Sequence, residues 1–572
     1  MNGLLLLIIC VVLLAAGYIL YGGWLVKQWG VGEKGQETPA HRIDDGGVDY
    51  VPAKAPVLMG HHFSSIAGAG PITGPISAVS LGFGWLACAL WIVIGGIFFG
   101  GVHDFGALIA SVRHDGKSIG EIISVNMSRR AKRLFIIFSY VTLILVVAAF
   151  ASIVATTFGA TYTEAGVLDQ VASTANAQVA MVSLLFILIA IVFGYMVYRR
   201  NASMLVSTIV GIAAIVAIIA IGLNFHPIYL SQTTWMWIVG IYIAIASVTP
   251  VWILLQPRDY LSSFLLYAML VIALFACIVS HPSMDSLPVI QSADSLKPVF
   301  PVLFTTIACG AISGFHSLVS SGTSSKQLDK EMDAKPIAYG GMLLECVLAV
   351  MTLVAVAYAY KYNQSAEVPL SGATAIFGGG LAHMIDDVIP GSYNVLFTLL
   401  VLTYSAFCLT SLDTATRLAR FMFQEFWIDS DKGETAENVT GYKKFFCNPY
   451  VATIITVILG ILLGLNGYAK VWALFGSANQ LLAAIGLLAV AAWLGNIGKN
   501  NKMIIFPMAF MLLVTITSLI INTKEQIGII SAGEADWGPW VQAIIGIILV
   551  ILAVVLAIEG VQTILNPKKN VK

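Results

Sequence analysis

Charged residues are scarce in this sequence. Only 10% of its 572 residues are Asp, Glu, Lys or Arg, whereas soluble domains carry about 25%. Hydrophobic residues make up 58% of the chain, and the mean hydropathy is +0.88. A water-soluble fold could not bury that much apolar surface. We therefore expect most of the chain to lie in a lipid bilayer, as an all-α protein that crosses the membrane many times.

Signatures of soluble enzymes and of metal or disulfide sites are also missing. The sequence contains no HExxH, GxSxG or Walker motif, and its carboxylates are not paired in a way that suggests hydrolysis. The cysteines show neither CxxC nor Cys/His metal spacing, and we interpret them as small hydrophobes. They are Cys10, Cys88, Cys277, Cys309, Cys346, Cys408 and Cys447. We expect no enzyme activity, no bound metal, no cofactor apart from a coupling H⁺ or Na⁺, and no nucleic-acid partner.

Fifteen apolar runs are long enough, at roughly 20 residues, to cross a bilayer. They lie near 3–26, 58–80, 84–110, 134–158, 179–198, 203–223, 235–255, 260–280, 300–322, 339–360, 392–416, 450–466, 470–495, 503–521 and 540–563. The first run lacks a basic leader and a small-residue cleavage site, so we expect a retained span. If the loop 27–57 is cytoplasmic, 26 of the 30 Lys and Arg residues fall in cytoplasmic segments. This bias predicts an inner (plasma) membrane protein with its N-terminus outside and its C-terminus in the cytoplasm.

Two of these runs are interrupted by Gly, Pro and polar residues. The first contains GHHFSSIAGAGPITGP (60–75), and the second contains IACGAISGFHSLVSSGTSSK (307–326). Lipid tolerates broken helices only where protein or a water-filled cavity covers them. Small residues also allow membrane helices to pack closely, but two polar breaks in matched positions favour a binding site. We expect the unwound positions to be Gly68, Gly70, Pro71, Ser313 and Gly314.

The charge count gives the two broken spans opposite orientations, and each opens a set of five spans. This arrangement is typical of transporters built from inverted repeats. The predicted fold is therefore a 5+5 inverted repeat with additional helices, about 15 spans in all. The predicted units are 1–57 (first helix and cytoplasmic loop), 58–223 (first repeat), 224–299 (inserted hairpin), 300–495 (second repeat) and 496–572 (C-terminal helices).

Three loops are longer than simple connections. The external segment 361–391 is amphipathic but too short to span the membrane, and predicts a helical lid over the external mouth. The Gly- and Pro-rich loop 27–57 is expected to lie against the bundle. The segment 417–449 is expected to be the largest cytoplasmic loop.

Ionisable residues inside the membrane are costly and mark functional sites. His61 and His62 open the first broken span, and His316 lies in the second. A histidine changes charge near neutral pH, so His62 and His316 are candidates for proton coupling. They could also serve only as hydrogen-bond partners of backbone carbonyls. Asp104, near the cytoplasmic face, is a candidate for a gate or ion pair.

Asp413 is the other candidate for coupling. It follows the hydroxyls of Thr410 and Ser411 and precedes Arg417 by four residues. This pattern favours either a cation or proton site that faces the broken span, or an ion pair with Arg417 that neutralises itself. The sequence leaves both interpretations open.

Three further charged residues are interpreted as structural. Arg258 and Asp259 follow Gln256–Pro257 and are expected to anchor a cytoplasmic turn. Glu345 lies early in its span and is expected to be interfacial.

Six stretches together resemble the carbon starvation protein A family. They are GHHFSSIAGAGPITGP (60–75), GGVHDF (100–105), TPVWILLQPRDYLSSFLLY (249–267), ISGFHSLVSSGTSSKQL (312–328), CLTSLDTATRLARF (408–421) and WALFGSANQLLAA (472–484). The resemblance runs over most of 50–490. It implies a bacterial or archaeal uptake carrier associated with nutrient limitation, for peptides or, with a proton gradient, for pyruvate. It also implies the leucine-transporter-like inverted repeat.

The resulting hypothesis is a secondary active importer of a small carboxylate-bearing solute that works by alternating access. The candidate substrate-binding residues are Ser65, Gly68, Gly70, Pro71, Thr73, Ser313, Gly314, His316, Ser317 and Ser320. The candidate coupling residues are His62, His316, Thr410, Ser411, Asp413 and Asp104. Three alternatives stay open: a sodium-coupled amino-acid carrier with its ion at Gly68, Thr410 and Ser411, a nutrient sensor with a carrier fold, and a channel.

Overall fold

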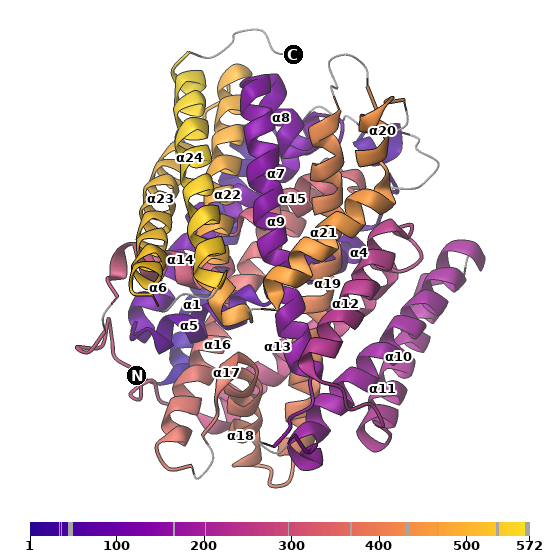
Figure 1. Ribbon diagram of the computed structural model, residues 1–572, viewed down its shortest axis with the longest axis vertical. Helices are drawn as coiled ribbons and strands as arrows, with labels where there is room; N and C mark the ends of the chain where they lie inside the picture. Colours follow the sequence, from indigo (N-terminus) through magenta and orange to yellow (C-terminus); the bar gives the residue numbers. More distant parts are fainter. Residues whose placement is uncertain are drawn as a thin grey trace.

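Backbone N–H and C=O groups find no water in lipid, so long apolar runs must fold as helices. They do so throughout the computed structural model (Figure 1). The structure describes residues 1–566 except 34, 36, 44–49, 164–165, 201, 296, 367–368, 429–433, 436–437, 466 and 534–536. These described residues form no β-strand, only four isolated bridges.

The helices of the first half of the chain include two π-helical turns, η1 and η2. Their bounds are α1 (Gly3–Ala16), η1 (Gly17–Tyr21), α2 (Gly22–Trp29), α3 (Pro39–Arg42), α4 (Ala55–Ile66), α5 (Gly70–Ser80), α6 (Trp85–Gly95), η2 (Gly96–Gly100), α7 (Gly101–Arg113), α8 (Ile119–Asn126), α9 (Arg129–Phe158), α10 (Gln170–Arg200), α11 (Met204–Asn224), α12 (Gln232–Val248) and α13 (Leu255–Ser280).

The second half contains further short π and 3₁₀ turns around the second break and the lid. The bounds are η3 (Val299–Leu303), α14 (Phe304–Ile307), η4 (Ala308–Gly310), α15 (Gly314–Gly322), η5 (Ser324–Lys326), η6 (Glu331–Asp333), η7 (Lys335–Gly340), α16 (Gly341–Asn363), α17 (Gly372–Thr374), η8 (Ala375–Gly379), α18 (Gly380–Asp386), α19 (Tyr393–Trp427), α20 (Tyr442–Phe446), α21 (Pro449–Gly464), α22 (Tyr468–Asn496), α23 (Lys502–Ser531) and α24 (Trp537–Leu565).

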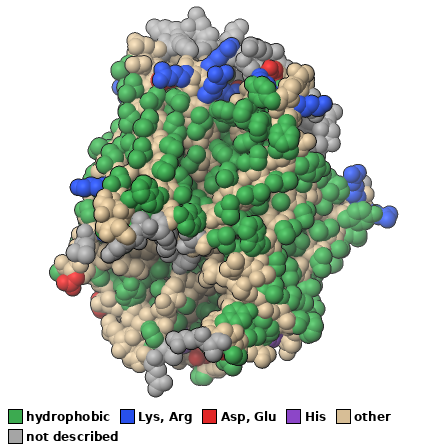
Figure 2. Space-filling view, in the orientation of Figure 1, with side chains coloured by type: hydrophobic (Ala, Val, Ile, Leu, Met, Phe, Trp, Pro, Cys, Tyr) green, Lys and Arg blue, Asp and Glu red, His purple; other side chains and the backbone are tan. Residues whose placement is uncertain are grey.

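Twelve helical segments of the described chain are long and apolar enough to cross a membrane. The three other predicted spans coincide with the shorter apolar helices α12 and α21 and with the consecutive pair α4 and α5. The prediction of an all-α, multi-pass membrane protein is therefore confirmed. Figure 2 shows hydrophobic side chains over the sides of the molecule and Lys and Arg side chains gathered toward its upper end.

The first broken span consists of α4 and α5. Helix α4 ends at Ile66, and the backbone leaves the helical region at Ala67 (φ −74°, ψ 60°). Helix α5 then begins at Gly70, with Pro71 in its first turn, where the missing proline N–H costs no helical hydrogen bond. Gly68 is thus unwound as predicted. Gly70 and Pro71 instead begin the second half-helix, because the break comes slightly earlier than expected.

The second broken span runs from η3 through α15. Helix α14 ends at Ile307, and Ala308 takes a left-handed φ of 41°. The short turn η4 follows, and Ser313 is extended (φ −140°, ψ 127°) just before α15 begins at Gly314. Ser313 is therefore unwound as predicted, whereas Gly314 is the first residue of a half-helix.

The two broken spans lie side by side and run antiparallel. His62 of α4 contacts Ser324, with 2.7 Å between Nδ1 and Oγ. Further along, Gly70 packs on Cys309, and Gly74 packs on the Ile307 carbonyl. The partner numbers fall as the numbers along α4 and α5 rise. The opposite orientations expected of an inverted repeat are therefore present in the contacts themselves.

The predicted lid is helical, as expected, and consists of α17, η8 and α18 at the lower end of Figure 1. We call this the lid end of the bundle, and the opposite end, near Arg113 and Lys326, the basic end. The described part of the loop 27–57 contacts the bundle, where His41 Nε2 is 2.7 Å from Asp329 Oδ1, and its residues 34, 36 and 44–49 lie outside the described part of the chain. The predicted loop 417–449 is shorter than expected because α19 continues to Trp427. Its residues 429–433 and 436–437 lie outside the described part of the chain.

Candidate functional site

The two breaks pack closely against each other within the bundle. A Cβ atom placed on Gly70 would lie 2.2 Å from Cys309 Cβ, and one on Gly74 would lie 2.5 Å from the Ile307 carbonyl oxygen. Such contacts are possible only for glycine, which lets backbone approach backbone. The glycines of the first stretch therefore serve to bring the two half-helix junctions together.

A buried ionic network, which we call the arginine cluster, ties the first broken span to α13 and α19. It comprises Arg258, Asp259, Asp413, Tyr242 and His61. Arg258 forms ion pairs with Asp413 and with Asp259, the latter at 3.1 Å. Asp413 Oδ2 also accepts a hydrogen bond from the Tyr242 hydroxyl at 2.8 Å. His61 Nδ1 lies 2.9 Å from Asp259 Oδ2.

The arginine cluster corrects two expectations. Arg258 and Asp259 are not anchors of an exposed turn, because their side chains are only 2% and 0% exposed within the bundle. Of the two interpretations left open for Asp413, the ion pair with Arg417 is wrong. Asp413 pairs with Arg258, while Arg417 donates to the backbone carbonyls of Ala246 and Thr249 at the end of α12. Charges far apart in the sequence outcompete the local i,i+4 partner here.

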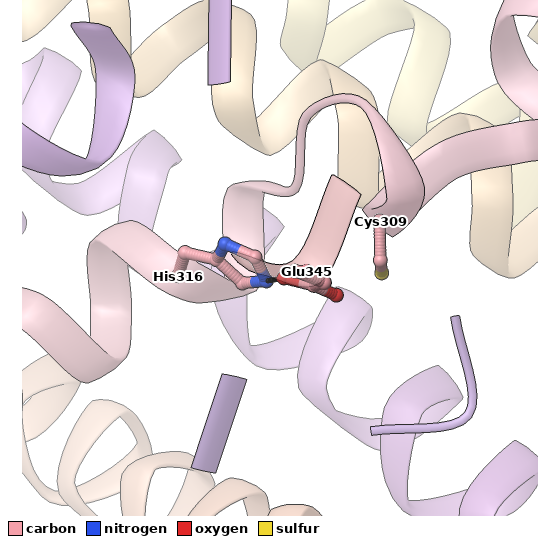
Figure 3. A group of neighbouring side chains, drawn as sticks. All are labelled: Cys309, His316 and Glu345. Atoms are coloured by element: carbon pink, nitrogen blue, oxygen red, sulfur yellow. Dashed lines mark ion pairs between the residues drawn. The ribbon is translucent and has the colours of Figure 1, made fainter. Parts of the chain in front are cut away.

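A second buried group, which we call the histidine cluster, lies beside the second break. It comprises His103, Asp104, His316, Glu345 and Cys309. Asp104 accepts from both histidines: Oδ1 lies 2.7 Å from His103 Nδ1, and Oδ2 lies 2.8 Å from His316 Nδ1. His316 Nε2 lies 3.3 Å from Glu345 Oε2. Figure 3 shows the Glu345 carboxylate between the His316 imidazole and the Cys309 side chain. The interfacial position expected for Glu345 is wrong, because its side chain is fully buried.

Several predicted residues line the first break. The Ser65 carbonyl accepts a hydrogen bond from the Ser411 hydroxyl at 3.0 Å, and the Ser65 hydroxyl reaches Asp259 at 3.3 Å. Gly68 faces α19 and α9, since a Cβ on it would lie 2.8 Å from Ser411 Oγ and 2.7 Å from the Phe150 ring. The structure therefore brings Ser65, Gly68 and Ser411 together.

Other predicted residues are buried but make different contacts. Ser313 accepts from the Asn479 amide at 3.0 Å. The Ser317 and Thr410 hydroxyls donate to carbonyls of their own helices, so they do not join the network between the breaks. The Ser320 hydroxyl is buried without a hydrogen-bond partner among the described residues.

Two vestibules approach the breaks from opposite ends. The lid-end vestibule, about 380 Å³, is lined by Thr73, Thr305, Ala373 and Trp472 among others. The basic-end vestibule, about 370 Å³, reaches Leu318 and Ser321 of α15, among others.

Neither vestibule reaches the fully buried histidine cluster. Thr73 lines the lid-end vestibule, and its hydroxyl lies 2.9 Å from that of Tyr404. Tyr404 lines a smaller cavity of about 190 Å³, which shares Ala373 with the lid-end vestibule.

Sequence reasoning missed the residues that hold the second break in place. Asn479 accepts from the Phe315 N–H at 2.8 Å, and Gln480 donates to the Phe304 carbonyl at 2.6 Å. These adjacent amides lie on α22, one bonded to each side of the break. The signal was available, because an Asn–Gln pair inside an apolar run is costly unless it satisfies broken backbone.

The chain matches the sequence family described as "Carbon starvation protein CstA" over residues 2–368 and 357–518. It is 30% identical to the peptide transporter CstA of Bacillus subtilis, with 89% of each chain covered. It is also 30% identical to the peptide transporter CstA of Escherichia coli, over 89% of this chain and 79% of that protein. The pyruvate/proton symporter BtsT of E. coli is 29% identical, over 79% of this chain and 72% of that protein.

Solved structures of transporters are similar at lower identity. A manganese transporter of Eremococcus coleocola, in complex with an aromatic bis-isothiourea substituted compound, is 13% identical with a TM-score of 0.49 and covers 91% of this chain and 99% of its own. MhsT in complex with L-phenylalanine is 14% identical with a TM-score of 0.46, over 89% and 99%. The breaks and the antiparallel orientation of the two spans are established by the contacts within this chain, without reference to these structures. By the family match and its relatives, the chain belongs to the carbon starvation protein CstA family and is a multi-pass membrane transporter.

Proposed function

We propose that this chain is a secondary active importer of a small carboxylate-bearing nutrient, a short peptide or pyruvate, and that it works by alternating access. The observation that carries this proposal is the meeting of two broken helices between two vestibules that open to opposite ends of the bundle. A solute bound at the breaks would be reached from one vestibule at a time. The lid end would then face outward and the basic end the cytoplasm.

The chemistry of the breaks suits a carboxylate. Helices α5 and α15 both begin at the breaks, so the partial positive charge of two half-helix N-termini points toward the same region. Ser313 and Thr73 add hydroxyl groups near these starts. The names of the relatives support the two solute classes: peptides for the CstA proteins and pyruvate for the symporter of E. coli.

We place the coupling proton in the arginine cluster. One guanidinium there faces two carboxylates, Asp259 and Asp413, so one negative charge is left over when His61 is neutral. Asp413 Oδ1 is buried and has no hydrogen-bond partner among the described residues. A proton on Asp413 would balance the charge and loosen its contact with Arg258. Proton binding would thereby alter how α19 is held to α13, next to the first break. The coupling roles of His62, Asp104 and His316 stay predictions.

Sodium coupling is the second candidate, because the Ser411 hydroxyl meets the Ser65 carbonyl at the unwound Gly68. Hydroxyl and free carbonyl oxygens are ligands that transporters use for Na⁺. In this alternative, sodium would lie between α4 and α19, and Asp413 would keep its ion pair throughout the cycle.

Uptake into proteoliposomes tests the proposal. Pyruvate and a panel of dipeptides are offered with an acid-outside pH gradient in sodium-free buffer. We expect accumulation that stops when a protonophore collapses the gradient. Uptake that needs sodium and ignores the pH gradient would favour the second candidate. Solute binding that raises thermal stability without any flux would favour a sensor instead of a carrier.

A further inference from the structure

The histidine cluster contains buried nitrogen and oxygen atoms that lack a hydrogen-bond partner among the described residues. His316 Nε2 and both carboxylate oxygens of Glu345 are inaccessible to solvent and form no hydrogen bond with any described residue. Asp104 Oδ2 lies 2.8 Å from His316 Nδ1, so this nitrogen carries the hydrogen that the carboxylate accepts. His316 Nε2 then carries a lone pair, and it lies 3.3 Å from Glu345 Oε2. Two buried lone pairs at this distance repel each other unless a proton or a metal ion lies between them.

The charge of the cluster also calls for a cation. Asp104 and Glu345 are two fully buried carboxylates. The ion pairs that described residues form with them involve only His103 and His316, with no Lys or Arg. An uncompensated charge at membrane depth is costly, so two carboxylates here need two positive charges between them. One dication would supply both, and Cys309 would bind it as a thiolate after releasing its proton, so the cluster would change from two net negative charges to one.

A third possible ligand atom, the sulfur of Cys309, indicates which kind of dication fits the cluster. Cys309 Sγ, a ring nitrogen of His316 and a carboxylate oxygen of Glu345 all lie within 4.8 Å of one another, and all three residues are buried (Figure 3). Sulfur, imidazole and carboxylate ligands suit zinc-type transition metals, whereas Mg²⁺ and Ca²⁺ prefer oxygen alone. Metal–ligand bonds of about 2.0–2.3 Å place the ligand atoms of a tetrahedral site roughly 3.5 Å apart. The three atoms would therefore have to move about 1 Å closer to one another when the metal binds.

The neighbour of His316 fits the same chemistry. A histidine that binds metal through one nitrogen usually donates its other N–H to a carboxylate, which fixes the ring. Asp104 has that position. We propose that Cys309, His316 and Glu345 bind one transition-metal dication of the zinc type, with Asp104 as the positioning residue that orients His316. Three protein ligands leave a fourth place for water or another oxygen ligand. This site is separate from the arginine cluster, so the proposal does not depend on the coupling ion or on the solute.

Cobalt binding to the purified full-length protein tests the site. The protein in detergent is stripped with a chelator and titrated with Co²⁺, a spectroscopic substitute for Zn²⁺. We expect saturation at one Co²⁺ per chain, with a sulfur-to-cobalt charge-transfer band in the near ultraviolet, and displacement of Co²⁺ by Zn²⁺. No saturable binding, or saturation without the sulfur band, would overturn the proposal. In that case a proton shared by His316 and Glu345 would balance their facing lone pairs. This result on the wild-type protein decides the question even if variants fold poorly.

Three variants locate the site. Cys309→Ser should remove the sulfur band and weaken Co²⁺ binding at least about tenfold, whereas Cys88→Ser, at another buried cysteine outside the cluster, should leave both unchanged. Asp104→Asn should keep the sulfur band and weaken binding by about 10- to 100-fold, as expected of a residue that orients a ligand. An unchanged spectrum in Cys309→Ser would contradict the assignment. A loss of uptake without any change in cobalt binding would concern the proposed transport function alone.

Discussion

Gly70 lies directly against Cys309: a β-carbon on Gly70 would come within 2.2 Å of the Cys309 β-carbon and 2.5 Å of its sulfur. Each residue stands at the junction of a broken span, so this contact joins the two broken spans. The contact has no room for even one methyl group. It also places the proposed solute site and the histidine cluster at the same level of the bundle, where a movement of one break must move the other.

The hydroxyl contact between Thr73 and Tyr404 should hold the lid-end vestibule closed. Tyr404→Phe removes the hydrogen bond between its hydroxyl and that of Thr73, worth about 1 kcal/mol or a factor of about five in an equilibrium. We expect a membrane-impermeant thiol reagent, applied from the lid end with a chelator present, to reach Cys309 several-fold faster in this variant. Peptide mass spectrometry would identify the modified cysteine.

Tyr140→Phe is the matched control for this gate. It removes a similar hydroxyl contact, to Thr456 at 3.3 Å, where α9 meets α21. Its Cys309 should react at the wild-type rate. Equal labelling of all three proteins would show that Thr73 and Tyr404 do not gate the vestibule.

Two substitutions in the arginine cluster should differ in their effects on folding stability and on proton coupling. Arg258→Gln leaves two buried carboxylates without their cation, and should cost about 3–5 kcal/mol of the free energy of unfolding. Asp413→Asn keeps the pair of Arg258 with Asp259, and should cost less stability. Uptake by Asp413→Asn should no longer respond to a pH gradient.

An exposed ion pair provides the control for these variants. Arg42 and Asp115 pair with side chains that are about half exposed, so Arg42→Gln should change stability by less than about 1 kcal/mol. Thermal unfolding in detergent gives the order of stability, and proteoliposomes give the response to pH. If the Asp413→Asn protein still accumulates solute in response to an imposed pH gradient, the coupling proton does not bind in the arginine cluster.

The lid should lose stability in acid because of His383. Its ring lies 4.1 Å from that of Tyr362 and 4.3 Å from that of Tyr393, measured between ring centres. This burial lowers the pKa of His383 below its usual value, which is about 6.5. The neutral ring is thus favoured in the folded lid. The stabilisation is present above the ordinary pKa and is lost as the pH falls through it.

Hydrogen exchange of the Gly380–Asp386 amides can follow this loss. We expect protection of α18, corrected for intrinsic exchange rates, to fall between about pH 7.5 and pH 5.5. His383→Phe should keep the ring packing and remove this dependence. The same drop in protection in the phenylalanine variant would mean that another group controls the lid.

Much of this architecture follows from local sequence patterns. The apolar runs, the two breaks and the opposite orientations could be predicted, because lipid requires helices and penalises polar residues strongly. Gly68 and Ser313 were placed correctly because few residue types suit an unwound backbone in a membrane.

Pairings between distant helices could not be predicted in the same way. Arg258 looked like an anchor of a turn, and Arg417 looked like the partner of Asp413, since only neighbours in the chain can be paired from sequence alone. The contact of Cys309 with Gly70 and the partners of Glu345 depend on how the spans pack. Burial decides whether such residues are interfacial or functional, and burial is a property of the whole bundle.

The most direct test of the account is uptake by Gly70→Ala. The added methyl group has no space beside Cys309, and overpacking of this kind costs about 1–3 kcal/mol. Gly528→Ala is the matched control, because a Cβ on that helical glycine of α23 meets nothing within 4 Å. Both variants should insert and purify as the wild type does. We predict that Gly70→Ala loses at least about nine-tenths of proteoliposome uptake while Gly528→Ala transports normally. Normal uptake by Gly70→Ala would contradict a solute site at the meeting of the two breaks.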